Sequence, residues 1–294
     1  MSQYSIKDVE NLSGIKAHTL RIWEQRYDIL KPKRTETNIR YYDDLDLKLI
    51  LNISVLNKHG HKISKIALMS HEELRGELLH LTDKTQDAED KIQALTLCMI
   101  DMDEEKFEYL LSQSIIQVGF ENTMLKIVFP FLQKIGILWL AGTINPAQEH
   151  FISNLIRQKI IVAIDNLKPN YTKGKKYLLF LPEGEWHEVT LLFSNYLIRS
   201  RGQRTSYLGQ TLPFDDLKQA YKAIQPDFLL AILTSSNSFQ HTQQYIKELG
   251  CSFPNSKILL AGSQVIGQDF EVPPNCEILN KMEDLLAFIE ENKA

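Results

Sequence analysis

Apolar residues follow two different patterns along this chain. Up to about residue 166 they recur every three or four positions, which is the spacing of one face of an amphipathic helix. Beyond a polar stretch around Pro169 and Gly174, short uninterrupted apolar runs alternate with further helical patterns. The chain is therefore predicted to be helical in its first part and to alternate strands and helices in its second.

Residues 1–80 predict a small helical domain. Ser5 is a suitable N-cap for its first helix, and Ser13-Gly14 ends that helix. The second helix turns Leu20 and Trp23 inward, with the direction of Ile22 left open. Two short helices joined by a tight glycine-containing turn are the helix-turn-helix geometry, whose second helix enters the major groove of DNA. The helices of this domain are predicted at about 5–13, 16–27, 45–58 and 63–69.

A basic segment from Leu30 to Tyr42 follows the second helix. Pro32 and Thr37-Asn38 interrupt it, and it ends in Arg-Tyr-Tyr, as expected for a small hairpin that places cations and phenol hydroxyls against phosphates. The helix pair and the basic loop, each taken by itself, also have an explanation that involves no DNA. A helix pair can be a plain structural hairpin, and a basic loop can be solvated surface.

Residues 81–170 predict a four-helix bundle, and residues 171–294 predict an α/β domain. Pro130 lies inside the third bundle helix and should bend it. Alternating strands and helices give a doubly wound parallel sheet of the Rossmann-like or flavodoxin-like kind. The bundle helices are predicted at 91–100, 104–117, 121–140 and 146–166. The strands are predicted at 177–181, 204–208, 227–234, 257–261 and 277–279, with helices at 187–200, 214–224, 238–249 and 281–291.

Composition and charge narrow the class of protein. The 294 residues suffice for two or three domains. The chain has no apolar segment of transmembrane length and no secretory pattern at its start, which predicts a cytoplasmic protein with no membrane partner. Residues 1–80 carry 13 Lys and Arg against 11 Asp and Glu, a balance of +2, and the remainder carries 20 against 26, a balance of −6. A modestly basic module is thus joined to an acidic one. The cysteines Cys98, Cys251 and Cys276 are far apart and are predicted to be reduced thiols.

The first domain resembles the DNA-binding domain of MerR-type transcriptional regulators. Thr37-Asn38 stands where that family usually has a glycine at the tip of its wing, and asparagine tolerates a positive φ. The form Leu-Arg-x-Trp-Glu is similar to the subgroup that pairs this domain with cobalamin modules. The matching stretches are Thr19-Leu20-Arg21-Ile22-Trp23-Glu24-Gln25-Arg26-Tyr27, Leu30-x-Pro32-x-Arg34 and Arg40-Tyr41-Tyr42.

This resemblance implies double-stranded operator DNA as the partner. MerR-type metal sensors present cysteines after this domain, and residues 1–97 contain none, so a metal-ion sensor of that kind is not expected. The residues that the resemblance marks for DNA contact are Thr19, Arg21, Trp23, Arg26, Tyr27, Arg34, Arg40, Tyr41 and Tyr42.

His187 lies just after the first predicted strand of the α/β domain. Ligands of parallel sheets bind beyond the carboxyl ends of the strands, and there His187 is flanked by Glu185 and Glu188. A histidine in this place can coordinate a metal through one ring nitrogen while a carboxylate holds the other. A lone histidine at a helix start is more often a surface residue or a cap, so position alone leaves both interpretations open.

The stretch that begins at Glu185 resembles the Asp/Glu-x-His-x-x-Gly signature of cobalamin-binding domains. The resemblance implies that His187 is the lower axial ligand of cobalt. Thr190 replaces the glycine that lets the nucleotide tail pass close to the backbone, and Ala261 replaces the first residue of a Gly-Gly element. Flavodoxin-like domains that bind no ligand have similar strand ends. The contacts implied on this domain are Glu185, His187, Thr190, Ser235 and Gly262.

The bundle resembles the helical cap of cobalamin-sensing regulators of the CarH type. Trp139 is followed after nine residues by Glu149-His150, as in that family, although a tryptophan at a helix end is also typical of a plain core. In the family the tryptophan covers the upper face of adenosylcobalamin, which implies this cofactor and places Glu149 and His150 near its upper ligand. Light-responsive members have a histidine directly after the tryptophan, where this chain has Leu140. The light response is therefore expected to be weakened, altered or absent.

The sequence thus predicts a multidomain transcription regulator, not an enzyme. It is expected to bind operator DNA as a homodimer or homotetramer, under the control of cobalamin bound between the helical cap and the sheet domain. Two alternatives stay open. A MerR-type regulator with a degenerate sensor would bind no cobalamin, as Thr190, Leu140 and Ala261 would explain. A corrinoid carrier for a methyltransferase is the other, and the amino-terminal domain argues against it.

Overall fold

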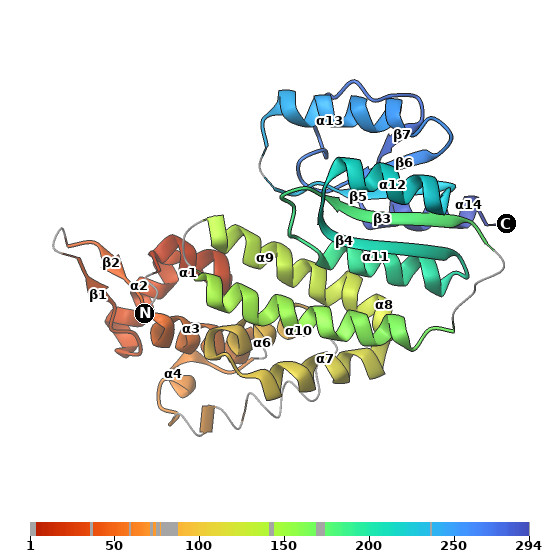
Figure 1. The fold of residues 1–294 in the computed structure, drawn as a ribbon. Coiled ribbons are helices and arrows are strands. Elements are labelled where there is room, and N and C mark those ends of the chain that lie inside the picture. Colours follow the sequence, from red (N-terminus) through yellow and green to blue (C-terminus); the bar gives the residue numbers. More distant parts are fainter. Residues whose placement is uncertain are drawn as a thin grey trace. The chain divides into compact units, whose positions relative to one another are not determined.

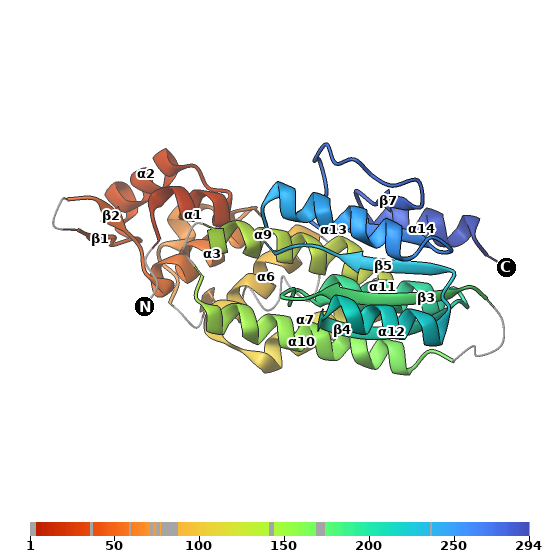
Figure 2. The same ribbon diagram turned by 45° about the horizontal axis from the view of Figure 1, so that its top comes forward.

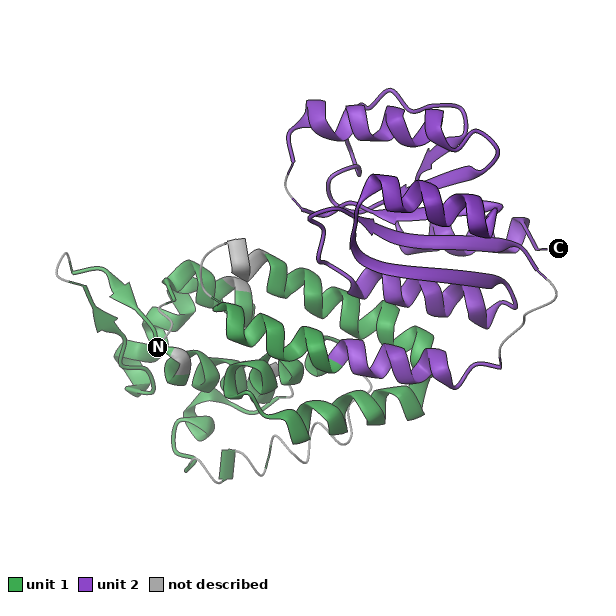
Figure 3. Cartoon of the chain, in the orientation of Figure 1, with its two compact units in different colours: residues 1–155 green, residues 156–294 purple. Residues whose placement is uncertain are grey.

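The computed structural model describes residues 4–35, 38–58, 60–70, 73–74, 77, 88–140, 144–168, 174–235 and 237–293. For residues 11, 44, 58 and 137–140 the description covers the backbone alone. The chain divides into two compact units, residues 1–155 and 156–294, and the division falls inside helix α10 (Pro146–Asp165) (Figure 3). The predicted DNA-binding domain and most of the predicted bundle therefore share the first unit.

Helices α1 (Ile6–Ser13) and α2 (Ala17–Tyr27) form the predicted helix-turn-helix pair (Figure 1). The Asp8 amide donates to the hydroxyl of Ser5 at 3.3 Å, and the Ser5 amide donates to the Asp8 carboxylate at 2.8 Å. This reciprocal pair satisfies two amides at the start of α1 that lack helical partners. Gly14, with a φ of 71°, ends α1 in the left-handed conformation. The predicted cap and stop are thus confirmed.

Strands β1 (Lys33–Arg34) and β2 (Arg40–Tyr41) pair antiparallel and form a small wing (Figure 1). Asn38 lies in the turn between them and has a φ of 63°, which is the left-handed conformation expected of it. The guanidinium of Arg34 donates to the side-chain oxygen of Asn38 at 2.9 Å. The wing turn is therefore held by the residue that stands where the family has glycine.

Helices α3 (Asp44–Lys58) and α4 (Ile63–Ile66) complete this domain around an apolar core. Leu20 is fully buried and Trp23 is 6% exposed, as predicted. Ile22 is 47% exposed, which settles its direction as outward. One face of α2 is therefore used for packing, and the opposite face meets solvent.

The bundle has the four predicted helices and an irregular turn at Pro130. Proline has no amide hydrogen, and its ring clashes with the carbonyl four residues earlier, so a regular helix cannot pass through it. Here a five-residue π-helical turn precedes Pro130 and relieves the clash. The predicted interruption thus takes the form of a π turn. The elements are α6 (Ala88–Asp101), α7 (Glu104–Val118), α8 (Phe120–Thr123), η1 (Met124–Val128), α9 (Phe129–Leu140) and α10.

Two polar contacts join the DNA-binding helices to the bundle inside the first unit. Nζ of Lys134, on α9, donates to the carbonyl of Leu12 near the end of α1 at 2.7 Å. Nζ of Lys48, on α3, lies 2.6 Å from the carboxylate of Asp101 at the end of α6. Burial lowers the pKa of Lys134 to about 8, because the charged form is poorly solvated there. These contacts explain why the two predicted domains form one packing unit.

The second unit is a five-stranded parallel sheet with helices on both faces (Figure 2). Its strand order is β4-β3-β5-β6-β7, and every neighbouring pair is parallel. On one face α11 packs against α14, and on the other Phe214 of α12 contacts Tyr245 of α13 with ring centroids 5.8 Å apart. The predicted doubly wound fold is confirmed. The strands are β3 (Lys176–Pro182), β4 (Arg204–Leu212), β5 (Phe228–Ile232), β6 (Lys257–Ala261) and β7 (Cys276–Ile278). The helices are α11 (Val189–Ser200), α12 (Phe214–Ile224), α13 (Phe239–Ser252) and α14 (Met282–Glu291).

The strand order places a crevice between the ends of β3 and β5. From β3 the chain winds outward to β4 on one side, and the later strands β5, β6 and β7 lie on the other. The loops after β3 and β5 therefore leave the sheet toward opposite faces, and ligands of such folds bind in the gap that this reversal creates. His187 follows β3, and Ser235 follows β5. The fold thus brings both predicted loops to one place.

Candidate functional site

The exposed face of α2 carries the cations expected to meet DNA. Arg21 and Arg26 are exposed, and the guanidinium of Arg26 lies 5.7 Å from the centroid of the Tyr27 ring. Thr19 and Tyr27 are half-buried on the same helix. The second helix of such a pair presents this face to base edges and phosphates.

The wing is tied to α2 by one ion pair. Nε of Arg40 donates to the carboxylate of Glu24 at 3.0 Å, and the two side chains are 27% and 18% exposed. Arg34 stays exposed beside the wing turn, and Tyr41 is half-buried on β2. The Glu24–Arg40 pair therefore sets the angle of the wing against the helix, while Arg34 presents a cation outward.

Trp23 and Tyr42 correct the predicted set of DNA contacts. Trp23 is 6% exposed and Tyr42 is fully buried, and the backbone of Tyr42 pairs with that of Tyr4 at 2.8 Å. A side chain without exposed surface cannot reach a phosphate or a base edge while the domain is folded. Both are core residues, and the candidate contacts become Thr19, Arg21, Arg26, Tyr27, Arg34, Arg40 and Tyr41.

Glu185 is a buried carboxylate at the end of β3 that joins two loops. Its side chain is 5% exposed. One oxygen accepts hydrogen bonds from the amides of Thr234 and Ser235 at 2.7 and 2.5 Å, and the other accepts the amides of Trp186 and His187, both at 3.0 Å. Glu185 therefore bridges the crevice between β3 and β5.

The ionisation of Glu185 is set by these hydrogen bonds. Burial by itself raises the pKa of a carboxyl group, because the anion loses its water. Hydrogen bonds from the His187 ring and from the amides of Ser235, His187 and Thr234 outweigh burial and lower the pKa of Glu185 to about 2. The group is therefore an anion throughout the neutral range.

Glu185 also holds the ring of His187. Nδ1 of His187 lies 2.6 Å from a Glu185 oxygen, while the imidazole side chain is 62% exposed at the sheet edge. In the tautomer that donates from Nδ1, the ring carries its lone pair on Nε2. A carboxylate on one nitrogen is the arrangement that fixes the tautomer and the orientation of metal-ligating histidines. The structure thus brings together the pair on which the sequence hypothesis depends.

Glu188 lies in a separate buried network. One of its oxygens accepts the Tyr207 hydroxyl at 2.8 Å, and the other lies 2.7 Å from a guanidinium nitrogen of Arg157. Burial and the bond to Glu188 raise the pKa of Tyr207, so the phenol remains a neutral donor. In the sequence Glu188 stands out only as a neighbour of His187, and nothing in it points to Arg157 or Tyr207. These two come from α10 and β4, and no local motif connects them.

Thr190 and Gly262 lie near the same sheet edge in different surroundings. Thr190 is half-buried in the first turn of α11. Gly262 has a φ of 108°, and a Cβ atom there would lie 2.2 Å from the carbonyl oxygen of Leu233. Only glycine fits where the two strand ends approach this closely. Backbone packing is therefore sufficient to explain why residue 262 is a glycine.

The candidate residues of the bundle lie at the end of helix α9 and near the start of helix α10. Glu149 and His150 lie in the first turn of α10, with a carboxylate oxygen 3.3 Å from Nδ1 of His150, which is 71% exposed. Trp139 and Leu140 lie at the end of α9, and their side chains are outside the described part of the structure. The roles given to them stay predictions.

The described residues contain neither a cluster of metal-ligating side chains nor a membrane-spanning helix. Among them no group of three or more His, Cys, Asp or Glu could hold a metal ion. No helix in the described part of the chain has both the length and the apolarity needed to span a bilayer.

Comparison with known proteins shows two matched regions and similar regulators. Residues 4–73 match the model of the MerR HTH family regulatory protein, and residues 91–163 match that of the B12 binding domain. The chain is 27% identical over 257 residues to the HTH-type transcriptional repressor CarH of Myxococcus xanthus, covering 85% of each chain. It is 26% identical over 225 residues to the repressor CarA of the same organism, covering 76% of this chain and 73% of CarA.

A solved structure supports the fold alone. The monomethylamine corrinoid protein of Methanosarcina barkeri matches 70% of this chain and 99% of its own length, with a TM-score of 0.57 and 13% identity. At that identity, shared architecture says nothing of shared function.

The chain thus combines a MerR-type helix-turn-helix domain with a helical region that matches a B12 binding domain, and a Rossmann-like parallel sheet follows that region. Its homology to the repressors CarH and CarA indicates a MerR-type transcription regulator.

Proposed function

We propose that this chain binds operator DNA and that cobalamin controls its operator affinity or its oligomerisation. The observation that supports the proposal most is His187, held by buried Glu185 at the crevice of the sheet, in a chain that also carries a MerR-type domain. The pair fits a corrinoid, because a single imidazole is enough for a metal that brings its own equatorial ligands. When bound, cobalamin would supply a cobalt centre that the imidazole of His187 would coordinate.

The residues around His187 have distinct proposed tasks. Glu185 orients the imidazole through its contact with Nδ1. Because Glu185 also accepts the amides of Thr234 and Ser235, a shift of the ring would be felt in the loop after β5. The proposed nucleotide-tail contacts at this edge are Thr190, Ser235 and Gly262.

The bundle is proposed to supply the residues that contact the upper ligand of the bound cobalamin. Trp139, Glu149 and His150 are the candidates, with adenosylcobalamin as the bound form. Leu140 stands where light-responsive members of the family have a histidine, so this position would offer no imidazole to the cofactor. A light response is therefore proposed to be weakened, altered or absent.

Operator binding is proposed to need more than one copy of the chain. One winged domain offers few base contacts, so two copies on a pseudo-palindrome are needed for useful specificity. Cobalamin can act only through a difference in affinity between assembly states. A homodimer or homotetramer whose population depends on cobalamin meets both requirements.

The visible spectrum tests the proposal. Purified protein is mixed with adenosylcobalamin in the dark, desalted, and its spectrum recorded before and after green light. The wild-type protein is expected to retain the cofactor, and His187→Ala is expected to retain at least tenfold less at the same ligand concentration. His241→Ala removes another exposed imidazole at this sheet edge and serves as the control.

Two outcomes contradict the proposal in different ways. A colourless wild-type protein would favour the degenerate sensor, and half-buried Thr190 would then be the first residue to replace by glycine. Equal retention by wild type and His187→Ala would leave cobalamin bound without this ligand.

A further inference from the structure

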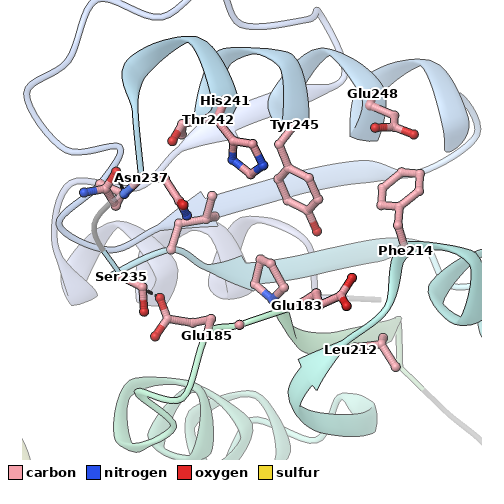
Figure 4. A pocket seen from close by; sticks show the side chains of 14 residues that line it. Glu183, Glu185, Leu212, Phe214, Ser235, Asn237, His241, Thr242, Tyr245 and Glu248 are labelled. Atoms are coloured by element: carbon pink, nitrogen blue, oxygen red, sulfur yellow. Dashed lines mark hydrogen bonds between the residues drawn. The ribbon is translucent and has the colours of Figure 1, made fainter.

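A cavity of about 410 Å3 opens at the carboxyl edge of the sheet, on the face covered by α12 and α13 (Figure 4). Its walls come from the loops after β3, β4, β5 and β6 and from one side of α13. None of its lining residues comes from α11, the helix that follows His187. The volume is typical of sites for small molecules. The apolar part of the wall is Pro182, Leu212, Phe214 and Leu233.

Four polar side chains converge on this cavity. Glu183, His241, Tyr245 and Glu248 line it, and Figure 4 shows them around the same hollow. None of these side chains has a hydrogen bond to another residue in the described part of the chain. Burial, together with the charge of Glu248, raises the pKa of Tyr245, so its hydroxyl stays protonated. These groups are therefore available to a ligand, whereas both oxygens of Glu185, also in the wall, are already bonded to backbone amides.

The charge of the wall selects the kind of ligand. Three carboxylates line the cavity, those of Glu183, Glu185 and Glu248, and no lysine or arginine is among the described lining residues. Phosphate and carboxylate ligands are disfavoured, because they would carry the same charge as the three carboxylates of the wall. At the rim, Nζ of Lys218 lies 4.6 Å from the centroid of the Phe214 ring and 3.3 Å from the carboxylate of Asp215, so an ammonium group already lies against this aromatic ring.

We propose that this cavity binds a small organic amine in its protonated form. The ammonium groups pair with the carboxylates of Glu183 and Glu248 and donate to the Tyr245 hydroxyl, while the aliphatic part lies on Leu212 and Phe214. Apart from Glu185 and Ser235, none of the lining residues is among those proposed for cobalamin. An amine bound here lies beside the loop that holds His187, since Gly184 and Glu185 form part of the wall.

Calorimetric titration of the full-length protein with spermidine tests the proposal. Spermidine is expected to bind the wild type, and the double variant Glu183→Gln/Glu248→Gln is expected to weaken binding at least tenfold. Asp165→Asn/Glu291→Gln removes two exposed carboxylates from α10 and α14 and should leave binding unchanged. The uncharged 1,4-butanediol and the anion succinate, titrated in the same way, are expected not to bind.

Several results would overturn this assignment. They are an absence of binding heat at millimolar spermidine, equal binding of butanediol, or equal affinity in the wild type and the Glu183→Gln/Glu248→Gln variant. Displacement of spermidine by excess hydroxocobalamin would assign the cavity to the corrinoid and would equally end the proposal. Since the titration is done without cobalamin, its failure is distinct from failure of the proposed cobalamin site.

Discussion

The DNA-binding surface and the edge of the sheet present their functional groups in opposite ways. On the first, Arg21, Arg26 and Arg34 are exposed on short elements. At the second, exposed His187 is positioned by Glu185, which is buried and accepts hydrogen bonds from two loops. A polyanion is bound by charges that adapt to it, whereas a metal needs one ligand in one orientation. The difference predicts that substitutions at the sheet edge act on stability, and those on α2 act on affinity.

The largest effect is expected for Glu185→Gln. A glutamine has one acceptor oxygen, and its NH2 group would face amide donors, so two of the bonds to Thr234, Ser235, Trp186 and His187 are lost. The free energy of unfolding should fall by about 2–4 kcal/mol, the range for leaving buried partners of a charged group unsatisfied. Urea denaturation followed by tryptophan fluorescence measures this.

The neighbouring Glu183→Gln is the matched control. Glu183 is exposed, so the same chemical change should alter stability by no more than about 0.5 kcal/mol. A loss below about 1 kcal/mol in Glu185→Gln, or equal losses in both variants, would show that the buried carboxylate does not organise this edge.

Lowering the pH should remove the stabilisation that the Glu185 carboxylate gives to the wild-type protein. The pKa of Glu185 is about 2 in the folded protein and about 4.3 in an unfolded chain. The stabilisation is therefore complete above about pH 5 and is lost as the pH falls toward 2, by up to about 3 kcal/mol. The difference in unfolding free energy between wild type and Glu185→Gln should shrink over this range. A difference in unfolding free energy between these two proteins that does not change with pH would contradict the lowered pKa of Glu185.

The Arg157–Glu188 pair is expected to have an intermediate effect. Arg157 is about one-third exposed and Glu188 is buried, so the pair is partly desolvated. A double-mutant cycle with Arg157→Met and Glu188→Gln should give a coupling energy of about 1–2 kcal/mol in unfolding. The Asp215–Lys218 pair on α12, exposed on both sides, serves as comparison and should couple by less than about 0.5 kcal/mol. Equal coupling in both cycles would show that burial adds nothing to the first.

The smallest effect on stability, and a clear one on affinity, is expected for Arg21→Ala. Loss of one groove or phosphate contact should weaken binding to an operator selected from random duplexes by about tenfold and reduce the salt slope by about one. The unfolding free energy should change by less than about 0.5 kcal/mol. Lys126→Ala removes an equally exposed cation from the bundle and should leave gel shifts unchanged. An equal loss of operator affinity in Arg21→Ala and Lys126→Ala would show that Arg21 contributes only through the net charge of the protein.

Local rules were sufficient for most of the secondary structure and failed where the backbone departs from them. The cap at Ser5 and the left-handed Asn38 follow from side-chain chemistry within a few residues. Strand β4 runs to Leu212, beyond its predicted end at Leu208, and passes through positive φ values at Gly209 and Thr211 that an apolar run does not reveal.

The candidate sites divide in the same way. Glu185 and His187 are two positions apart, so a local signature was able to propose them together. Trp23 belongs to a motif of DNA-binding residues, yet the motif could not say that the tertiary core would enclose its side chain. Arg157 and Tyr207 meet Glu188 only because α10 and β4 pack beside it.

The sequence by itself determined the order of the domains, the helix-turn-helix pair and the histidine at the end of the first strand of the sheet, because these depend on periodicity and on neighbours along the chain. Only the tertiary structure decided that Glu185 bridges two loops, that Tyr42 is enclosed, and that a cavity lined with carboxylates lies against α13. The physical reason is that burial and charge compensation depend on residues far apart in the chain, which only packing brings within hydrogen-bonding distance.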